Sequence, residues 1–107
     1  MQPIIVTTTC ESREDGELIA RSVLENRLSA CVQISGPVLS SYWWEDKITS
    51  ATEFLVVMKS ERGLFEQLSD TIRAVHPYEV PEIVAVAITA IDTPYKQWLE
   101  AELNHGK

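Results

Sequence analysis

The chain has 107 residues, of which 45% are hydrophobic. This length supplies the core of one domain, residues 1–107, without help from disulfides or a structural metal. Sixteen acidic against nine basic residues give a formal charge of −7, which argues against a nucleic-acid partner because polyphosphates repel such a surface. No apolar stretch approaches the ~20 residues that span a bilayer. Cys10 and Cys31 form no zinc-knuckle or disulfide pattern, so we expect a reduced, cytoplasmic protein that does not bind membranes.

The N-terminal half predicts a strand, a helix and a hairpin. Residues 3–9 are rich in β-branched side chains and favour a strand. Ser12 predicts the cap of a helix over 13–28, in which apolar residues recur every three or four positions: Ile19, Ala20, Val23, Leu24 and Leu28. Alternation over 30–34, an interruption at Gly36-Pro37 and further strand over 38–59 predict a long, bent hairpin that turns at Glu45, Asp46 and Lys47.

The C-terminal half predicts a helix, a stiff loop, a strand and a last helix. Ser60 is the expected cap of a helix with core positions Leu64, Phe65, Leu68, Ile72 and Val75. His76-Pro77 ends that helix, and residues 76–82 contain two prolines. Residues 83–89 are apolar on both sides, so we expect this strand inside the sheet or against another subunit. Asp92 and Pro94 predict a last helix with Tyr95, Trp98, Leu99 and Leu103 on one side, before a frayed tail over 104–107 that includes a solvated His105.

The order of these elements is that of an α+β, ferredoxin-like split βαβ fold with an added C-terminal helix. Two helices cover only one face of such a four-stranded antiparallel sheet, so the other face stays bare. The consecutive residues Tyr42, Trp43 and Trp44 must point to both faces of the hairpin. Because large apolar patches are uncommon on monomers, we expect an oligomer. Its interface would use the bare face and the aromatic residues Tyr42, Trp43, Trp44 and Trp98.

Cys10 and His76 are candidate metal ligands. Cys10 lies beside a helix N-terminus, which favours a thiolate that binds a soft metal; otherwise it is a small loop residue without a role. His76 offers an imidazole to copper or zinc, with Glu79 or Glu82 as an oxygen ligand; otherwise it caps the last carbonyls of the preceding helix. Cys31 alternates with apolar neighbours and is expected to be a buried structural thiol.

Glu53 and Lys59 are candidate residues of a ligand cleft. They share one face of a strand about 20 Å apart, so they cannot pair with each other. They either line an intersubunit cleft with Glu82, where Lys59 receives an anion or carboxylate, or belong to a structural ion pair with Glu82 or Glu79 of the same or a neighbouring chain. The sequence lacks GxGxxG, Walker, Ser-His-Asp and His-Glu-x-x-His patterns, so we expect no enzyme.

Several motifs along nearly the whole chain together resemble the CutA family of divalent-cation tolerance proteins. They are Thr7-Thr8, LSACV at 28–32, SYWW at 41–44 with Lys47-Ile48, Glu53 with Lys59, HPYEVPEI at 76–83, and Tyr95 with Trp98. The resemblance implies a tightly packed homotrimer related in architecture to PII signalling proteins. It also implies a role in tolerance of copper and other divalent metals, without catalysis or a required cofactor.

The resemblance to copper-binding members is incomplete at the metal ligands. Those members carry a cysteine at the position of Thr8 and a His-His pair where this chain has Val75 and His76. The resemblance therefore implies weak or transient binding of a divalent ion around His76, Cys10 and Glu79. Two other hypotheses stay open, a PII-like sensor of a small anionic ligand near Lys59 and a purely structural scaffold trimer.

Overall fold

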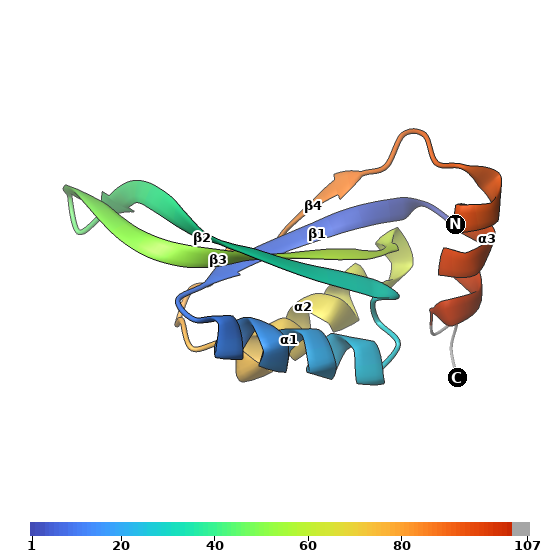
Figure 1. The fold of residues 1–107 in the computed structure, drawn as a ribbon, viewed down its shortest axis with the longest axis horizontal. Coiled ribbons are helices and arrows are strands. Elements are labelled where there is room, and N and C mark those ends of the chain that lie inside the picture. The colour runs from blue at the N-terminus through green and yellow to red at the C-terminus, as the bar shows by residue number, and fades with distance from the viewer. Residues whose placement is uncertain (104–107) are drawn as a thin grey trace.

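The computed structural model describes residues 1–103, which form one antiparallel sheet and three helices (Figure 1). The strands lie in the order β2-β3-β1-β4. Their bounds are β1 Pro3–Cys10, β2 Cys31–Trp44, β3 Lys47–Glu61 and β4 Val84–Ala87, and the helices are α1 Arg13–Glu25, α2 Phe65–Val75 and α3 Thr93–Glu102. The predicted α+β class and element order are confirmed. The predicted tail over 104–107, with His105, lies outside the described residues.

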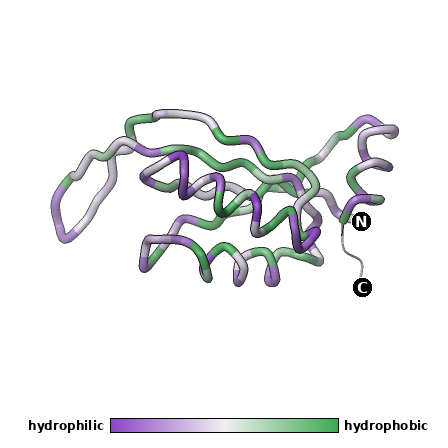
Figure 2. Tube along the Cα trace, turned by 60° about the horizontal axis from the view of Figure 1, so that its bottom comes forward, coloured by the Kyte–Doolittle hydropathy of each residue, from purple (hydrophilic) through white to green (hydrophobic). Residues whose placement is uncertain are grey.

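Helices α1 and α2 cover one face of the sheet, as predicted (Figure 1). Their apolar stripes alternate with hydrophilic residues along each helix (Figure 2), and the stripes meet the inward side chains of β1 and β3. Leu24 is 40% exposed, contrary to the prediction, because it lies beside the buried stripe formed by Gly16, Ile19 and Val23. The fully buried core includes Val6, Ile19, Val23, Val56, Met58, Leu68, Ile72 and Leu99.

Ser12 and Ser60 have different roles, although both were predicted to cap helices. The Ser12 hydroxyl accepts a hydrogen bond from the Asp15 backbone N–H at 3.1 Å, which confirms it as the cap of α1. Ser60 instead belongs to β3, where its buried hydroxyl donates to the Leu28 carbonyl at 2.6 Å. A 3-10 turn, Arg62–Leu64, separates β3 from α2, so the predicted Ser60 cap is wrong.

The predicted hairpin of β2 and β3 divides into an inner half and an outer half. The inner half, 31–35 with 55–59, lies in the sheet beside β1, which pairs with residues 54–61. The register then shifts at the predicted break, where Gly36 has a φ of +141° and an added Cβ would lie 3.0 Å from the Glu53 carbonyl oxygen. In the outer half, residues 38–44 pair with 47–53, and no other described strand pairs with them. We call residues 38–53 the ribbon; it projects beyond the rest of the sheet (Figure 1).

A two-residue turn closes the ribbon. Glu45 and Asp46 both have positive φ, 50° and 62°. These values are typical of a type I′ turn, whose twist matches that of the strands it joins. Trp44 and Lys47 form the last pair before the turn, so the predicted turn at Glu45, Asp46 and Lys47 begins and ends within one residue of the observed one.

Strand β4 lies at the edge of the sheet beside β1, and its residues are exposed. The prediction that residues 83–89 lie inside the sheet is therefore wrong, whereas their contact with another subunit stays a prediction. In α3 the predicted apolar side is split. Leu99 and Leu103 are buried, but Tyr95 and Trp98 are exposed because α3 crosses only one end of the sheet (Figure 1). No helix within residues 1–103 combines the length and apolar character needed to cross a bilayer.

Candidate functional site

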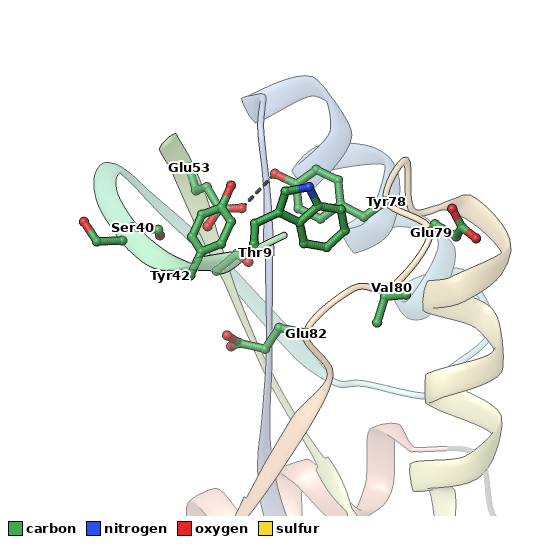
Figure 3. Close-up of a pocket in the computed structure, with 10 residues that line it drawn as sticks. Thr9, Ser40, Tyr42, Glu53, Tyr78, Glu79, Val80 and Glu82 are labelled. Carbon is green, nitrogen blue, oxygen red and sulfur yellow. Dashed lines mark hydrogen bonds between the residues drawn. The ribbon is translucent and has the colours of Figure 1, made fainter. Parts of the chain in front are cut away.

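A cavity of about 640 Å³ lies between the ribbon and the loop over residues 76–82 (Figure 3). Two of the sequence motifs, SYWW and HPYEVPE, meet here. The lining comprises Ser40, Ser41, Tyr42, Trp44 and Glu53 of the ribbon, Tyr78, Glu79, Val80 and Glu82 of the loop, and Thr9 of β1. Polar, aromatic and acidic side chains from three separate segments thus converge on one space.

The ribbon directs its consecutive aromatic residues to opposite faces. Tyr42 and Trp44 line the cavity. Trp43 lies between them in sequence and pairs across the ribbon with Ile48; each of these two residues is 72% exposed. The predicted two-sided arrangement follows from the alternation of side chains along a strand. One face of the ribbon therefore contributes to the cavity, and the other presents a bare apolar surface.

Glu53 and Tyr78 form the central hydrogen bond of the cavity. The Tyr78 hydroxyl donates to Glu53 Oε2 at 2.7 Å, and Glu53 is only 7% exposed (Figure 3). Burial and the hydrogen bond to the Glu53 carboxylate raise the pKa of Tyr78 well above its ordinary value of 10.0. The phenol therefore keeps its proton and remains a donor at neutral pH. Tyr78 was missed by the sequence analysis, although a phenol between two prolines in a stiff loop was an available signal.

His76 anchors the same loop to β1. Its Nε2 lies 2.8 Å from the Thr9 carbonyl oxygen, and its Nδ1 accepts the Tyr78 backbone N–H at 3.1 Å. These contacts place the ring proton on Nε2 and leave neither nitrogen with a free lone pair. A metal ion would bind Nδ1 only by displacing the Tyr78 N–H. The alternative that His76 caps α2 is met by its backbone alone, whose N–H donates to the Ile72 carbonyl oxygen at 2.9 Å.

Cys10 is a core residue at the end of β1 and not the loop residue of the alternative interpretation, whereas its role as a metal ligand stays a prediction. It is fully buried, and its Sγ donates to the Ser12 carbonyl at 3.4 Å. Burial and the nearby Asp15 raise the pKa of the Cys10 thiol, which disfavours the thiolate that a soft metal requires. Within residues 1–103, no three His, Cys, Asp or Glu side chains gather into a group that could hold a metal ion. The predicted set His76, Cys10 and Glu79 is therefore not a preassembled metal site in this chain.

Lys59 is separated from the other predicted cleft residues. Glu53 and Glu82 line this cavity within one chain, but Lys59 does not, and the cleft between subunits stays a prediction. Its Nζ donates to Gln33 Oε1 at 3.4 Å on the sheet face away from α1 and α2. The ion pairs found among the described residues do not include Lys59, so its expected pairing with Glu79 or Glu82 is not formed within one chain.

Cys31 lies on this bare sheet face and is half-buried rather than buried as predicted. It shares the face with Lys59, which is its register partner on β3. Burial and the neighbouring Cys31 raise the pKa of Tyr95 above its ordinary value of 10.0. Cys31 therefore lies near α3 and outside the cavity.

Comparisons with known proteins agree with this architecture. The family described as CutA1 divalent ion tolerance protein matches residues 4–102. The chloroplastic protein CutA of Arabidopsis thaliana is 38% identical over 97 residues, which cover 91% of this chain and 53% of that protein. The divalent-cation tolerance protein CutA of Thermus thermophilus is 37% identical over 95 residues, which cover 89% of this chain and 92% of that protein.

Solved structures give the same result at the level of the fold. The crystal structure of CutA1 from Oryza sativa has a TM-score of 0.95 and 32% identity, and the match covers 99% of this chain and 97% of that one. The chain spans about half the length of the plant and mammalian relatives that it matches. Because the family match extends over residues 4–102, and so over nearly all of the strands and helices described above, this chain belongs to the CutA1 family of divalent ion tolerance proteins.

Proposed function

We propose that this protein acts in divalent-cation tolerance as a homotrimer without catalytic activity that binds copper or another divalent ion weakly and transiently. The observation that carries the proposal is the apolar surface that one chain leaves exposed. Soluble monomers rarely expose large contiguous apolar patches, and self-association would bury the large apolar side chains that this chain exposes. The exposed residues lie on the ribbon, on β4 and on α3: Leu39, Trp43, Ile48, Val84, Val86 and Trp98.

The positions of these residues favour a ring of subunits. Strands β2 and β4 form the two edges of the sheet, and α3 lies at only one end of it, so no described helix covers the rest of the face opposite α1 and α2 (Figure 1). The ribbon and β4 are different surfaces, and a head-to-tail contact between them closes into a ring when the rotation between subunits permits. The trimer that we propose is a ring of this kind.

The available ligands support weak rather than tight metal binding. Glu79 and Glu82 are exposed carboxylates at the cavity, and carboxylate oxygens bind divalent cations. The softer ligands, His76 and Cys10, are held by their own hydrogen bonds. A cation held by so few oxygens exchanges readily, which suits a role in tolerance better than in storage. The unpaired Cys10 and Cys31 support a reducing compartment, and we place the protein in the cytoplasm.

Native mass spectrometry of the reduced protein tests the assembly. We expect a mass of three chains of 12.1 kDa at micromolar concentration. Trp43→Gln should shift the protein towards single chains, because it puts an amide into the proposed interface. Leu18→Gln is the matched control, since Leu18 is a similarly apolar, exposed residue but lies on α1. A monomeric wild type, or a trimer that Trp43→Gln leaves unchanged, would overturn this assembly.

Titration with copper and zinc in the same instrument tests the cation binding. At equimolar metal we expect partial occupancy that is lost on brief treatment with a chelator. Glu82→Gln should lower the occupancy further, because it removes a negative oxygen ligand. Full occupancy that survives the chelator would show a tight site and refute the weak binding proposed here.

A further inference from the structure

The cavity between the ribbon and the loop over residues 76–82 has the size and lining of a site for an organic molecule. Its volume of about 640 Å³ lies within the range of small-molecule pockets and far exceeds what one metal ion needs. Tyr42, Trp44 and Tyr78 supply aromatic walls. No Lys or Arg appears among the described residues that line it, so its charged groups are all carboxylates.

Two of the three carboxylates that line the cavity lie on the same side as the Tyr42 ring. Glu53 is 7% exposed and uses Oε2 to accept the Tyr78 hydroxyl, while no described residue donates to its Oε1. Figure 3 shows the carboxylates of Glu53 and Glu82 on the side of the Tyr42 ring, whereas Glu79 points the other way. A carboxylate oxygen that has no protein donor and faces the cavity is available to a positive group. The interior of the cavity thus favours a cation.

We propose that this cavity binds a small alkylammonium cation, whose positive nitrogen lies against Tyr42, Trp44 and Tyr78 and is neutralised by Glu53 and Glu82. Aromatic faces attract such cations, most strongly where water is excluded. A divalent metal ion would use only the carboxylate and hydroxyl oxygens of the lining, whereas an organic cation also contacts the three rings. The inference goes beyond the function proposed above, because the ligand is organic and depends on the aromatic walls as well as on the carboxylates.

Binding of choline to the full chain, measured by calorimetry and by tryptophan fluorescence, tests the charge requirement. The control ligand is the neutral isostere of choline, in which a tert-butyl group replaces the trimethylammonium group. We expect choline to bind saturably, and the neutral isostere to bind with an affinity lower by about tenfold or more. A parallel titration with putrescine shows whether a primary or a quaternary ammonium group has the higher affinity for the cavity. The proposal is overturned if neither cation binds saturably, or if the neutral isostere binds as well as choline.

Variants locate the binding within the cavity. Glu53→Gln keeps an oxygen acceptor for Tyr78 but removes the charge, and we expect about tenfold weaker binding of the cation. Glu82→Gln should also weaken binding of the cation, and it tests the role of the cavity carboxylates if Glu53→Gln does not fold. Glu25→Gln makes the same charge change on exposed α1 and should leave binding unaltered. Equal binding by wild type and both cavity variants would refute the assignment.

A change in the aromatic wall separates this site from metal binding. Trp44→Leu removes a ring but no oxygen ligand. It should therefore weaken alkylammonium binding several-fold while the weak occupancy by copper or zinc persists. An undiminished affinity for the cation in this variant would show that the rings do not contribute, and the proposal would fail independently of the proposed tolerance function.

Discussion

Replacement of Tyr78 by phenylalanine tests the central hydrogen bond of the cavity. The change removes the hydroxyl that donates to Glu53 Oε2 at 2.7 Å and keeps the ring, whose centroid lies 4.8 Å from that of His76. A hydrogen bond to a charged group contributes about 1.5–3 kcal/mol. Glu53 is 7% exposed and would lose this donor, but the cavity admits water that partly replaces it. We therefore expect the free energy of unfolding to fall by about 1–2 kcal/mol.

Urea denaturation at one fixed protein concentration measures this change, because self-association makes apparent stability depend on concentration. Tyr42→Phe is the control: it removes a hydroxyl from the same cavity for which the structure gives no hydrogen bond, and a change within about 0.5 kcal/mol is expected. A double-mutant cycle of Tyr78→Phe with Glu53→Gln should give a coupling free energy of about 1 kcal/mol. A coupling below about 0.3 kcal/mol would refute the assignment of this bond as a stabilising contact.

Three further predictions concern the core. Thr8→Val should raise the free energy of unfolding measured by urea denaturation by about 1 kcal/mol, because the buried Thr8 Oγ1 has no hydrogen-bond partner among the described residues. A loss of stability would show that the Thr8 hydroxyl has a hydrogen-bond partner. Gly16→Ala should raise the free energy of unfolding by up to about 1 kcal/mol, because alanine has the higher helix propensity and the new Cβ would lie in ordinary contact, 3.4 Å from Val56 Cγ2. A lower temperature of thermal unfolding would show that the added methyl group overpacks the core. Burial raises the pKa of Cys10 above 9.0, so above about pH 9 the thiol ionises in the unfolded chain before it does in the folded state, and the free energy of unfolding should fall as the pH rises. Cys10→Ala should make that fall shallower, and an unaltered pH profile of this variant would exclude the Cys10 thiol as its cause.

The parts of the fold that the sequence predicts correctly depend on local patterns. The β1 strand, the Ser12 cap and the bend at Gly36 each follow from residues that lie close together in the chain. The errors occur where a distant segment decides. Ser60 has the chemistry of a cap, but pairing with β1 continues β3 beyond it, to Glu61. Residues 83–89 have the composition of a central strand, yet only four of them pair, at the sheet edge.

The candidate site shows the same division. Glu53 and Glu82 were identified as cleft residues by their type and position, and both line the cavity. The partner of Glu53 is Tyr78, 25 residues away, and nothing in the strand pattern specifies the path of the loop that carries it. His76 has the chemistry of a ligand, but its bond to the Thr9 carbonyl, 67 residues distant, makes it a structural anchor. Side-chain type could be recognised from sequence, whereas the partner that determines its role could not.

The ribbon has a consequence for how this protein can be observed in solution. Two paired strands without a core are marginally stable alone, and residues 38–53 pair only with each other among the described residues. In an isolated chain their backbone amides should exchange with solvent by local opening, far faster than those of β1 and β3 in the sheet. A neighbouring subunit packed on Trp43 would slow that exchange without altering the central strands. The amides of this one segment therefore provide a residue-level measure of how much of the protein is assembled at a given concentration.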